Sequence, residues 1–306
     1  MPRIAVVGSN MVDLVTYVDR MPKDGETVEA PSFEMGLGGK GANQAVAAAK
    51  LGADVMMVSK VGDDLFAQNT IENFERLGID TRHVGRVPGM SSGVAPIFVL
   101  PSGENSILII KGANGALAPA DIDRAAEDLA RADLILMQLE VPLETVYHTI
   151  ALGARLGKET LLNPAPAAAD LDIARLRNLS FFVPNETELT LLTGLPVDGR
   201  PEIERAAQSL IAQGIRTVIV TMGGRGALLV TAEGSEPVVP VPVTPVDTTG
   251  AGDAFIGSFA RFYVEGRDLR ASLNRAARYA AHSITGRGTQ KSYATLAEFQ
   301  RFEAGL

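Results

Sequence analysis

The chain has 306 residues, of which 46% are hydrophobic, and this is enough apolar material for the core of one large α/β domain. Its formal net charge of −8 at pH 7 argues against a nucleic-acid-binding surface. The absence of cysteine excludes disulfides, thiolate metal sites and a cysteine nucleophile. Neither a targeting signal nor an apolar run of membrane-spanning length is predicted, so we expect a soluble cytoplasmic protein.

Apolar strands alternate with amphipathic helices through the first two thirds of the chain. The strand candidates are nearly continuous apolar runs, which is typical of strands buried on both faces of a parallel sheet. They are 3–8, 53–62, 132–140, 158–164, 179–185 and 216–223. The expected helices are 41–51, 64–77, 119–131, 142–156, 186–193 and 201–213, followed by 250–265, 268–285 and 294–304. The alternation predicts an α/β fold with right-handed crossovers.

Two segments interrupt this alternation. Residues 12–36 alternate apolar and polar positions without a helical period, and residues 91–112 predict a hairpin that turns at 101–104. Together they would form a small antiparallel sheet beside the main domain, serving as a lid over a ligand, as a dimer surface, or as both. An ordinary extension of the edge of the main sheet is the alternative.

A glycine-rich turn, GLGGKGANQAVAAAKLG (36–52), opens the first helix. It matches the G-x-G-x-x-G pattern of dinucleotide-binding proteins, but that pattern should directly follow the first buried strand, and here it does not. We therefore disfavour a dinucleotide-dependent oxidoreductase. The glycines would instead let the backbone approach a small polar ligand, with Lys40 and Asn43 around its hydroxyls. A solvated lysine and an ordinary polar helix residue are the alternatives.

The segment VDTTGAGDAF (246–255) places three small residues, Gly250, Ala251 and Gly252, before a carboxylate and an apolar helix. Small residues allow a ligand to approach the backbone, and the unpaired N–H groups of a helix start suit a phosphate. The carboxylate of Asp253 would repel that phosphate. Its presence is explained if it takes a proton from the group that attacks the phosphate.

Other candidates follow the ends of predicted strands, where open α/β sheets bind ligands. Asp13 could accept hydrogen bonds from sugar hydroxyls or be a turn aspartate, and Glu140 ends an apolar strand, where a carboxylate is costly without a partner. Asn185 and Glu188 share a face at a helix start and could contact a phosphate or the waters of Mg²⁺, or merely cap the helix. The glycine-rich turn 221–227 could contact phosphate or ribose, or be a plain hairpin turn.

Taken together, these residues resemble the ribokinase family of sugar kinases, which is also named after the minor phosphofructokinase. The two signatures are GGKGANQAVAAAKLG and DTTGAGDAFIGSF (247–259), with NPAP, PNETE and GRGTQKSY (286–293) in the family's order. The resemblance covers nearly the whole chain. It implies a single domain, 1–306, with the fold of a three-layer α/β sandwich, a mostly parallel central sheet and a small antiparallel lid formed by 12–36 and 91–112.

The resemblance also implies an ATP-dependent kinase with Mg²⁺ and an activating K⁺. In that family the turn formed here by Gly250, Ala251 and Gly252 is an anion hole for the γ-phosphate, and the residue matching Asp253 is the base. The implied sugar contacts are Asp13, Gly39, Lys40, Asn43 and Glu140. The implied nucleotide and Mg²⁺ contacts are Asn185, Glu188, Thr221, Gly223 and Gly226. The implied potassium ligands are Asp247, Thr249, Ser283, Gly286, Gly288 and Ser292, several of them through backbone carbonyls. The lid often pairs with a second copy, which implies a homodimer.

One departure from the family bears on the sugar. Many bacterial ribokinases carry GSINAD after the first strand, whereas this chain has GSNMVD, with Met11 in place of an asparagine that reaches the sugar. A thioether cannot satisfy a hydroxyl as an amide can, so a sugar that lacks one hydroxyl would lose less there. Residues 8–31 are also more similar to bacterial 2-deoxy-D-ribose kinases. We therefore expect phosphorylation of the 5-hydroxyl of 2-deoxy-D-ribose, with D-ribose as the alternative substrate.

Two further alternatives stay open. Ala277 stands where several relatives place a histidine or asparagine near the adenine, so the adenine contacts on this side are not predicted. A non-catalytic sugar sensor on the same scaffold is the more remote functional alternative. Every kinase interpretation requires residues 36–43 and 250–253 to line one cleft.

Overall fold

The computed structural model describes residues 1–102 and 104–306, and within them nine strands form a central sheet. These strands are β1 Arg3–Val7, β4 Asp54–Val61, β5 Asp80–Arg86, β8 Leu134–Met137, β9 Glu159–Leu162, β10 Phe181–Phe182, β11 Thr217–Thr221, β12 Ala227–Thr231 and β13 Gly234–Val238. Their order is β13-β12-β11-β10-β9-β8-β1-β4-β5. Neighbouring strands from β11 to β5 pair in parallel, and β12 and β13 are added antiparallel.

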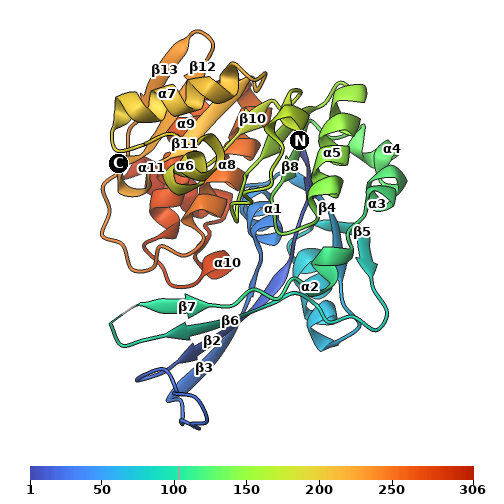
Figure 1. Ribbon diagram of the computed structural model, residues 1–306, viewed down its shortest axis with the longest axis vertical. Helices are drawn as coiled ribbons and strands as arrows, with labels where there is room; N and C mark the ends of the chain where they lie inside the picture. The colour runs from blue at the N-terminus through green and yellow to red at the C-terminus, as the bar shows by residue number, and fades with distance from the viewer. Residues whose placement is uncertain (103) are drawn as a thin grey trace.

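Helices cover both faces of this sheet, so the main body has three layers (Figure 1). One face is covered by α1 Lys40–Lys50, α2 Leu65–Arg76, α8 Ala251–Gly266, α9 Leu269–Ser283 and α11 Leu296–Ala304. The other is covered by α3 Pro119–Arg124, α4 Ala126–Leu129, α5 Leu143–Arg155, α6 Glu186–Thr193 and α7 Arg200–Ile211. A strand buried on both faces sends alternate side chains to two cores. In β1, Ile4 and Val6 join the first core, and Ala5 and Val7 join the second. The expected three-layer α/β fold is confirmed.

A second sheet projects from one end of the main body (Figure 1). In the described part of the chain it has four strands, β2 Met11–Tyr17, β3 Ser32–Gly38, β6 Val94–Val99 and β7 Asn105–Ile107, in the order β3-β2-β6-β7. The two segments expected to leave the alternation therefore do pair with each other. Gly103, in the expected turn 101–104, lies outside the described residues.

The expectation that this second sheet is entirely antiparallel is wrong at its centre. The outer pairs β2–β3 and β6–β7 are antiparallel, but β2 and β6 run parallel. Both strands leave the main body at the same place, because the N–H of Val12 donates to the carbonyl of Gly93 at 3.0 Å where the two strands begin. Two strands that start together at the body and extend away from it must run in the same direction.

The remaining differences concern short elements. The strands β5, β12 and β13 were not expected. The edge strand β5 is only half-buried and lacks a continuous apolar run. The turn 221–227 joins β11 to β12, so it is a hairpin turn, built on the short 3₁₀ helix Gly223–Arg225. The expected helix 119–131 divides into α3 and α4, and a one-turn helix, α10 Thr289–Ser292, precedes α11. In the described part of the chain, every helix falls short of the length and apolarity needed to cross a bilayer.

Candidate functional site

The predicted site residues gather at the carboxyl edge of the central sheet, next to the second sheet. Loops that leave β1, β8, β9 and β10 at this edge carry Asn10, Glu140, Asn163 and Asn185. Figure 1 shows the starts of α1 and α8 reaching the same region, where β2 and β3 leave the body. This edge is where open α/β sheets bind ligands, and the strand order alone would point to it.

Asp253 joins the two glycine-rich segments. Its carboxylate accepts hydrogen bonds from Asn43 Nδ2 at 2.9 Å and from Gln44 Nε2 at 3.0 Å, one on each oxygen. The side chain is almost fully buried, with 7% of its surface exposed. The residues 36–43 and 250–253 therefore meet in one site, as the kinase interpretation requires.

Three buried amide side chains behind Asp253 were not predicted as part of the site. Gln138 Nε2 donates to Gln44 Oε1 at 2.6 Å, and Gln44 Nε2 also lies 3.3 Å from Asn163 Oδ1. Gln138 directly follows the apolar run of β8, and a polar residue at that position is the signal that could have identified it. All three amides are buried.

Glu140 ties the loop after β1 to the start of α1. Its Oε2 accepts hydrogen bonds from Ser9 Oγ at 2.5 Å and from the main-chain N–H of Lys40 at 2.9 Å. At Gly39 the backbone has φ = +87°, and a Cβ there would lie 2.7 Å from the main-chain nitrogen of Met11. A glycine is therefore required for the two loops to approach so closely.

Asp13 lies in β2 with its carboxylate against the backbone of Gly38, where a Cβ would come within 2.3 Å of Oδ2. Burial raises the pKa of Asp13 to about 6, and the charges of Glu140 and Asp253 contribute in the same direction. Burial, reinforced by these two carboxylates, therefore makes ionisation of Asp13 costly.

Lys40 supplies the opposing charge. Burial alone would lower its pKa, but the carboxylates of Asp253, Glu140 and Glu188 outweigh burial and raise it. The lysine therefore stays protonated amid these acids. Its charge is attracted both by Glu140, on the side expected to bind sugar, and by Glu188, on the side expected to bind nucleotide.

Asn185 and Glu188 cap α6 reciprocally. Asn185 Oδ1 accepts from the N–H of Glu188 at 2.8 Å, and the N–H of Asn185 donates to Glu188 Oε2 at 2.8 Å. Burial raises the pKa of Glu188. Asn185 also forms an isolated bridge with Thr221, which brings the turn with Gly223 and Gly226 beside it. The helix-capping interpretation is thus correct, and the cap lies beside the turn after β11.

The segments 246–250 and 284–293 lie against each other. Asp247 accepts from the N–H of Thr249 and of Gly288, both at 2.9 Å. Burial opposes ionisation of Asp247, but these hydrogen bonds keep its pKa below the usual value. The other expected cation ligands belong to the same region: the Ser283 hydroxyl donates to Ala280 O, the Ser292 hydroxyl donates to Thr289 O, and Gly286 packs on the Ser292 side chain.

Gly250 begins α8 in the left-handed conformation, with φ = +76°. Its carbonyl accepts a hydrogen bond from the hydroxyl of Tyr293 at 2.8 Å, and that tyrosine is buried. The turn 250–252 and the segment that ends at Tyr293 are therefore fixed to each other. Tyr293 was part of a recognised motif but had no predicted role.

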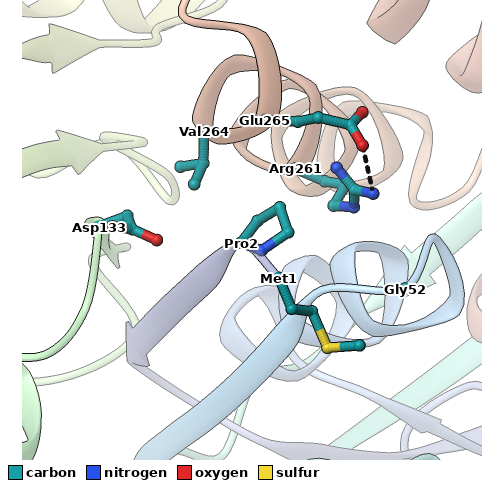
Figure 2. Close-up of a pocket in the computed structure, with 7 residues that line it drawn as sticks. All are labelled: Met1, Pro2, Gly52, Asp133, Arg261, Val264 and Glu265. Carbon is teal, nitrogen blue, oxygen red and sulfur yellow. Dashed lines mark hydrogen bonds and ion pairs between the residues drawn. The ribbon is translucent and has the colours of Figure 1, made fainter.

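Two features lie outside this site. Ala277, on α9, packs against the core and is half-buried. A cavity of about 490 Å³ opens at the amino edge of the sheet (Figure 2). It is lined by Pro2, Gly52 and Asp133, which precede β1, β4 and β8, and by Arg261 and Glu265 from the far end of α8. That cavity is on the opposite edge of the sheet from Asp253.

Comparison with known proteins identifies the family. The model of the pfkB family carbohydrate kinases matches residues 1–296. The chain is 58% identical to the deoxyribokinase of Salmonella typhi, covering 98% of both chains. It is 40% identical to the ribokinase of Mus musculus, covering 95% of this chain and 91% of the mouse protein. The structure of Arabidopsis thaliana ribokinase complexed with ribose and ATP matches with a TM-score of 0.93 at 30% identity, covering 98% of both chains. This chain belongs to the pfkB family of carbohydrate kinases.

Proposed function

We propose that this carbohydrate kinase transfers the γ-phosphoryl group of ATP to the 5-hydroxyl of 2-deoxy-D-ribose. The observation that carries the proposal is the placement of the Asp253 carboxylate at the start of α8, beside the turn 250–252 and held by Asn43 and Gln44. The 58% identity to a deoxyribokinase supports the choice of sugar. D-ribose is the alternative, because ribokinases are also full-length relatives.

Asp253 acts as the base in this proposal. An ionised carboxylate only accepts hydrogen bonds, and one amide donor on each oxygen fixes its plane without protonating it. It can then orient the 5-hydroxyl and take its proton as the oxygen attacks. The N–H groups of Ala251 and Gly252 stand at the positive end of α8, where they would stabilise charge on the transferring phosphoryl group.

The sugar is held between the loop after β1 and the start of α1. Asp13 and Glu140 offer acceptors and Asn43 offers both a donor and an acceptor, while Gly39 lets the sugar approach the backbone. Met11 is 3% exposed and stands at the junction of β1 and the second sheet. Its side chain offers no hydrogen-bond donor, which favours a sugar with one hydroxyl fewer.

The nucleotide lies on the other side of Asp253, against Asn185, Glu188, Thr221, Gly223 and Gly226. Mg²⁺ would accompany the ATP phosphates, neutralising their charge, with Glu188 and Asn185 reaching its waters. K⁺ would bind at Asp247, Thr249, Ser283, Gly286, Gly288 and Ser292. These residues offer only oxygen donors around one low-pKa carboxylate, and that donor set fits a hard monovalent cation.

The whole chain would act as one domain in which the sheet of β2, β3, β6 and β7 is a lid over the sugar. One surface of this lid exposes large apolar side chains, which fits pairing with a second copy to form a homodimer. These side chains are Phe33, Met35, Leu108 and Ile110, which the strand pairing places on one face of the sheet.

Asp253→Asn tests the mechanism, because it preserves shape and removes the base. We expect kcat for ATP-dependent phosphorylation of 2-deoxy-D-ribose to fall by about 10²- to 10⁴-fold, measured as coupled ADP release. Sugar binding, followed by thermal shift, should persist, and this separates lost chemistry from lost fold. Near wild-type turnover in the variant would refute the mechanism. Sugar binding by the wild type without any ADP release would favour the sensor alternative.

The same ADP-release assay compares 2-deoxy-D-ribose with D-ribose, in the presence and in the absence of K⁺. We expect a higher kcat/KM for 2-deoxy-D-ribose than for D-ribose, and a K⁺-dependent rate. Met11→Asn supplies an amide where the thioether stands, and it should shift the ratio of the two kcat/KM values toward D-ribose by about tenfold. An unchanged ratio would show that position 11 does not read the 2-hydroxyl, and equal efficiency on both sugars in the wild type would support the ribokinase alternative.

A further inference from the structure

A line of buried amides runs from the surface of α2 to the carboxylate of Asp253. Arg76 Nη2 donates to Asn73 Oδ1 at 2.7 Å, and Asn73 Nδ2 donates to Gln290 Oε1 at 3.0 Å. Gln290 Nε2 donates to Asn43 Oδ1 at 3.0 Å, and Asn43 Nδ2 donates to Asp253 Oδ2 at 2.9 Å. The three amides come from α2, α10 and α1, and each is at most 9% exposed.

The two ends of this line fix the direction of every bond in it. A guanidinium can only donate, and an ionised carboxylate can only accept. Each amide between Arg76 and Asp253 must therefore accept on the Arg76 side and donate on the Asp253 side. Reversing one amide would place two donors or two acceptors face to face somewhere along the line. Such a clash in a buried site is expensive because water cannot relieve it.

Gln290 is the central member, and its backbone is also held. Lys50 Nζ, on α1, donates to the carbonyls of Gln290 and Tyr293, both at 2.8 Å. Tyr293 in turn donates to the carbonyl of Gly250 at the start of α8. The segment 288–293 thus contacts the catalytic region twice, once at Asp253 through Asn43 and once at the turn 250–252.

We propose that Gln290 is a positioning residue for phosphoryl transfer: it sets the amide orientation of Asn43, which directs the donor of Asn43 at Asp253 and so aims the base at the sugar hydroxyl. The inference rests on the proposed role of Asp253. Gln290 reaches the base only through Asn43. The role of α10 is therefore to orient the base, and it is separate from binding either substrate.

Gln290→Glu reverses the polarity of one bond while preserving size. The carboxylate still accepts from Asn73, but it presents an acceptor to Asn43 Oδ1. Relief requires Asn43 to turn over, which places its oxygen against Asp253. We expect kcat to fall by about 10- to 100-fold at pH 8, with a smaller change in KM for ATP.

A second substitution at position 290, which removes the hydrogen bonds without imposing an acceptor, separates this effect of polarity from a packing defect.

Two variants serve as controls. Gln290→Met removes both hydrogen bonds without imposing an acceptor, so its loss in kcat should be smaller, about threefold. Gln208→Glu makes the same chemical change at a partly buried glutamine of α7 that donates to Thr231 O at 2.9 Å, far from the line of amides. It should leave kcat unchanged. Thermal unfolding of all three variants checks that each is folded.

Equal losses of kcat in Gln290→Glu and Gln290→Met would overturn the inference, since they would indicate packing alone. A folded Gln290→Glu with wild-type kcat at pH 8 would overturn it too. The activity of Asp253→Asn shows whether such a result contradicts only the role of Gln290 or the proposed mechanism as well. If Asp253→Asn is inactive and Gln290→Glu is normal, only the role of Gln290 is wrong, whereas an active Asp253→Asn removes the basis of both.

Discussion

At the scale of one residue, the buried carboxyl group of Asp13 lowers the stability of the ligand-free protein at neutral and higher pH. Its pKa is raised to about 6, first by burial and then by Glu140 and Asp253. The folded state therefore binds this proton more tightly than the unfolded chain does, whose aspartates titrate near 4. The contribution of Asp13 to stability is fully favourable below about pH 4 and is lost as the pH rises through 6.

Asp13→Asn removes this pH-dependent penalty. We expect the free energy of unfolding of the ligand-free variant to exceed that of the wild type by about 1–3 kcal/mol at pH 8, and the difference to shrink toward pH 5. Urea denaturation at both pH values measures it. The variant should also bind the sugar more weakly, because one of the two acceptor oxygens of the carboxylate is replaced by an NH₂ donor. An equal difference at both pH values would show that ionisation of Asp13 is not the cause.

The residues found from sequence and those missed differ in a physical way. Asp253, Lys40 and the glycines beside them could be predicted as site residues because a turn that binds a ligand needs particular residues at adjacent positions, and adjacency is visible in a sequence. Gln44 and Gln290 were missed because their partners are distant in the chain: Gln290 reaches Asn43 across 247 positions. Without the fold, a buried glutamine in such a network is indistinguishable from a solvated one.

At the scale of elements, the two glycines at the start of α8 have different surroundings. At Gly250, φ is +76°, and a Cβ would lie 2.3 Å from Thr289 Cγ2 and 2.8 Å from the hydroxyl of Tyr293. At Gly252, an added Cβ would have no heavy atom of the described residues within 4 Å apart from its chain neighbours and the backbone of its own helix. The first glycine is therefore required by the fold, whereas the second leaves open space in front of the turn.

Alanine at the two positions should separate these demands. Gly250→Ala should lower the free energy of unfolding by about 1–3 kcal/mol, through backbone strain and the clash with Thr289. Gly252→Ala should stay within about 0.5 kcal/mol of the wild type, yet lose at least about tenfold in kcat because its methyl occupies the space proposed for the γ-phosphate. Thermal or urea unfolding and the ADP assay measure the two effects. Full activity in Gly252→Ala would place the phosphate elsewhere.

The elements of the central sheet and their mostly parallel direction could be predicted from the sequence, but the direction of the pair β2–β6 in the second sheet could not. Parallel strands of the main sheet are buried on both faces, so their apolar runs stand out, and a glycine just after α1, α2, α5 and α7 marks where each of these helices ends. The parallel pair β2–β6 has no such signal. Its direction depends on where both strands leave the main body, which is fixed by the contact between Val12 and Gly93, two residues far apart in the chain. The half-buried edge strand β5 escaped notice for the same lack of a local pattern.

At the scale of the whole molecule, the main body and the sheet proposed as a lid both contribute residues to the candidate site. The main body holds Asp253 and Lys40 at the starts of α8 and α1, and Glu140 in the loop after β8. The lid contributes Asp13 from β2 and projects beyond the body (Figure 1). Four strands that leave the core depend on another surface to cover their apolar face. A second copy of the chain would provide that surface.

The dimer proposal predicts a mass of two chains in solution by light scattering. Leu108, 60% exposed beside β7, belongs to the apolar face of the lid, and Leu108→Glu should convert the protein to monomers because a charge in that interface stays unpaired. The monomer should show a higher KM for the sugar, since an unsupported lid holds Asp13 less firmly. Val239→Glu is the matched control: Val239 is 70% exposed and follows β13, at the far edge of the main sheet. It should leave both mass and KM unchanged. A monomeric wild type, or a Leu108→Glu variant that remains dimeric, would show that the apolar face of the lid serves another purpose.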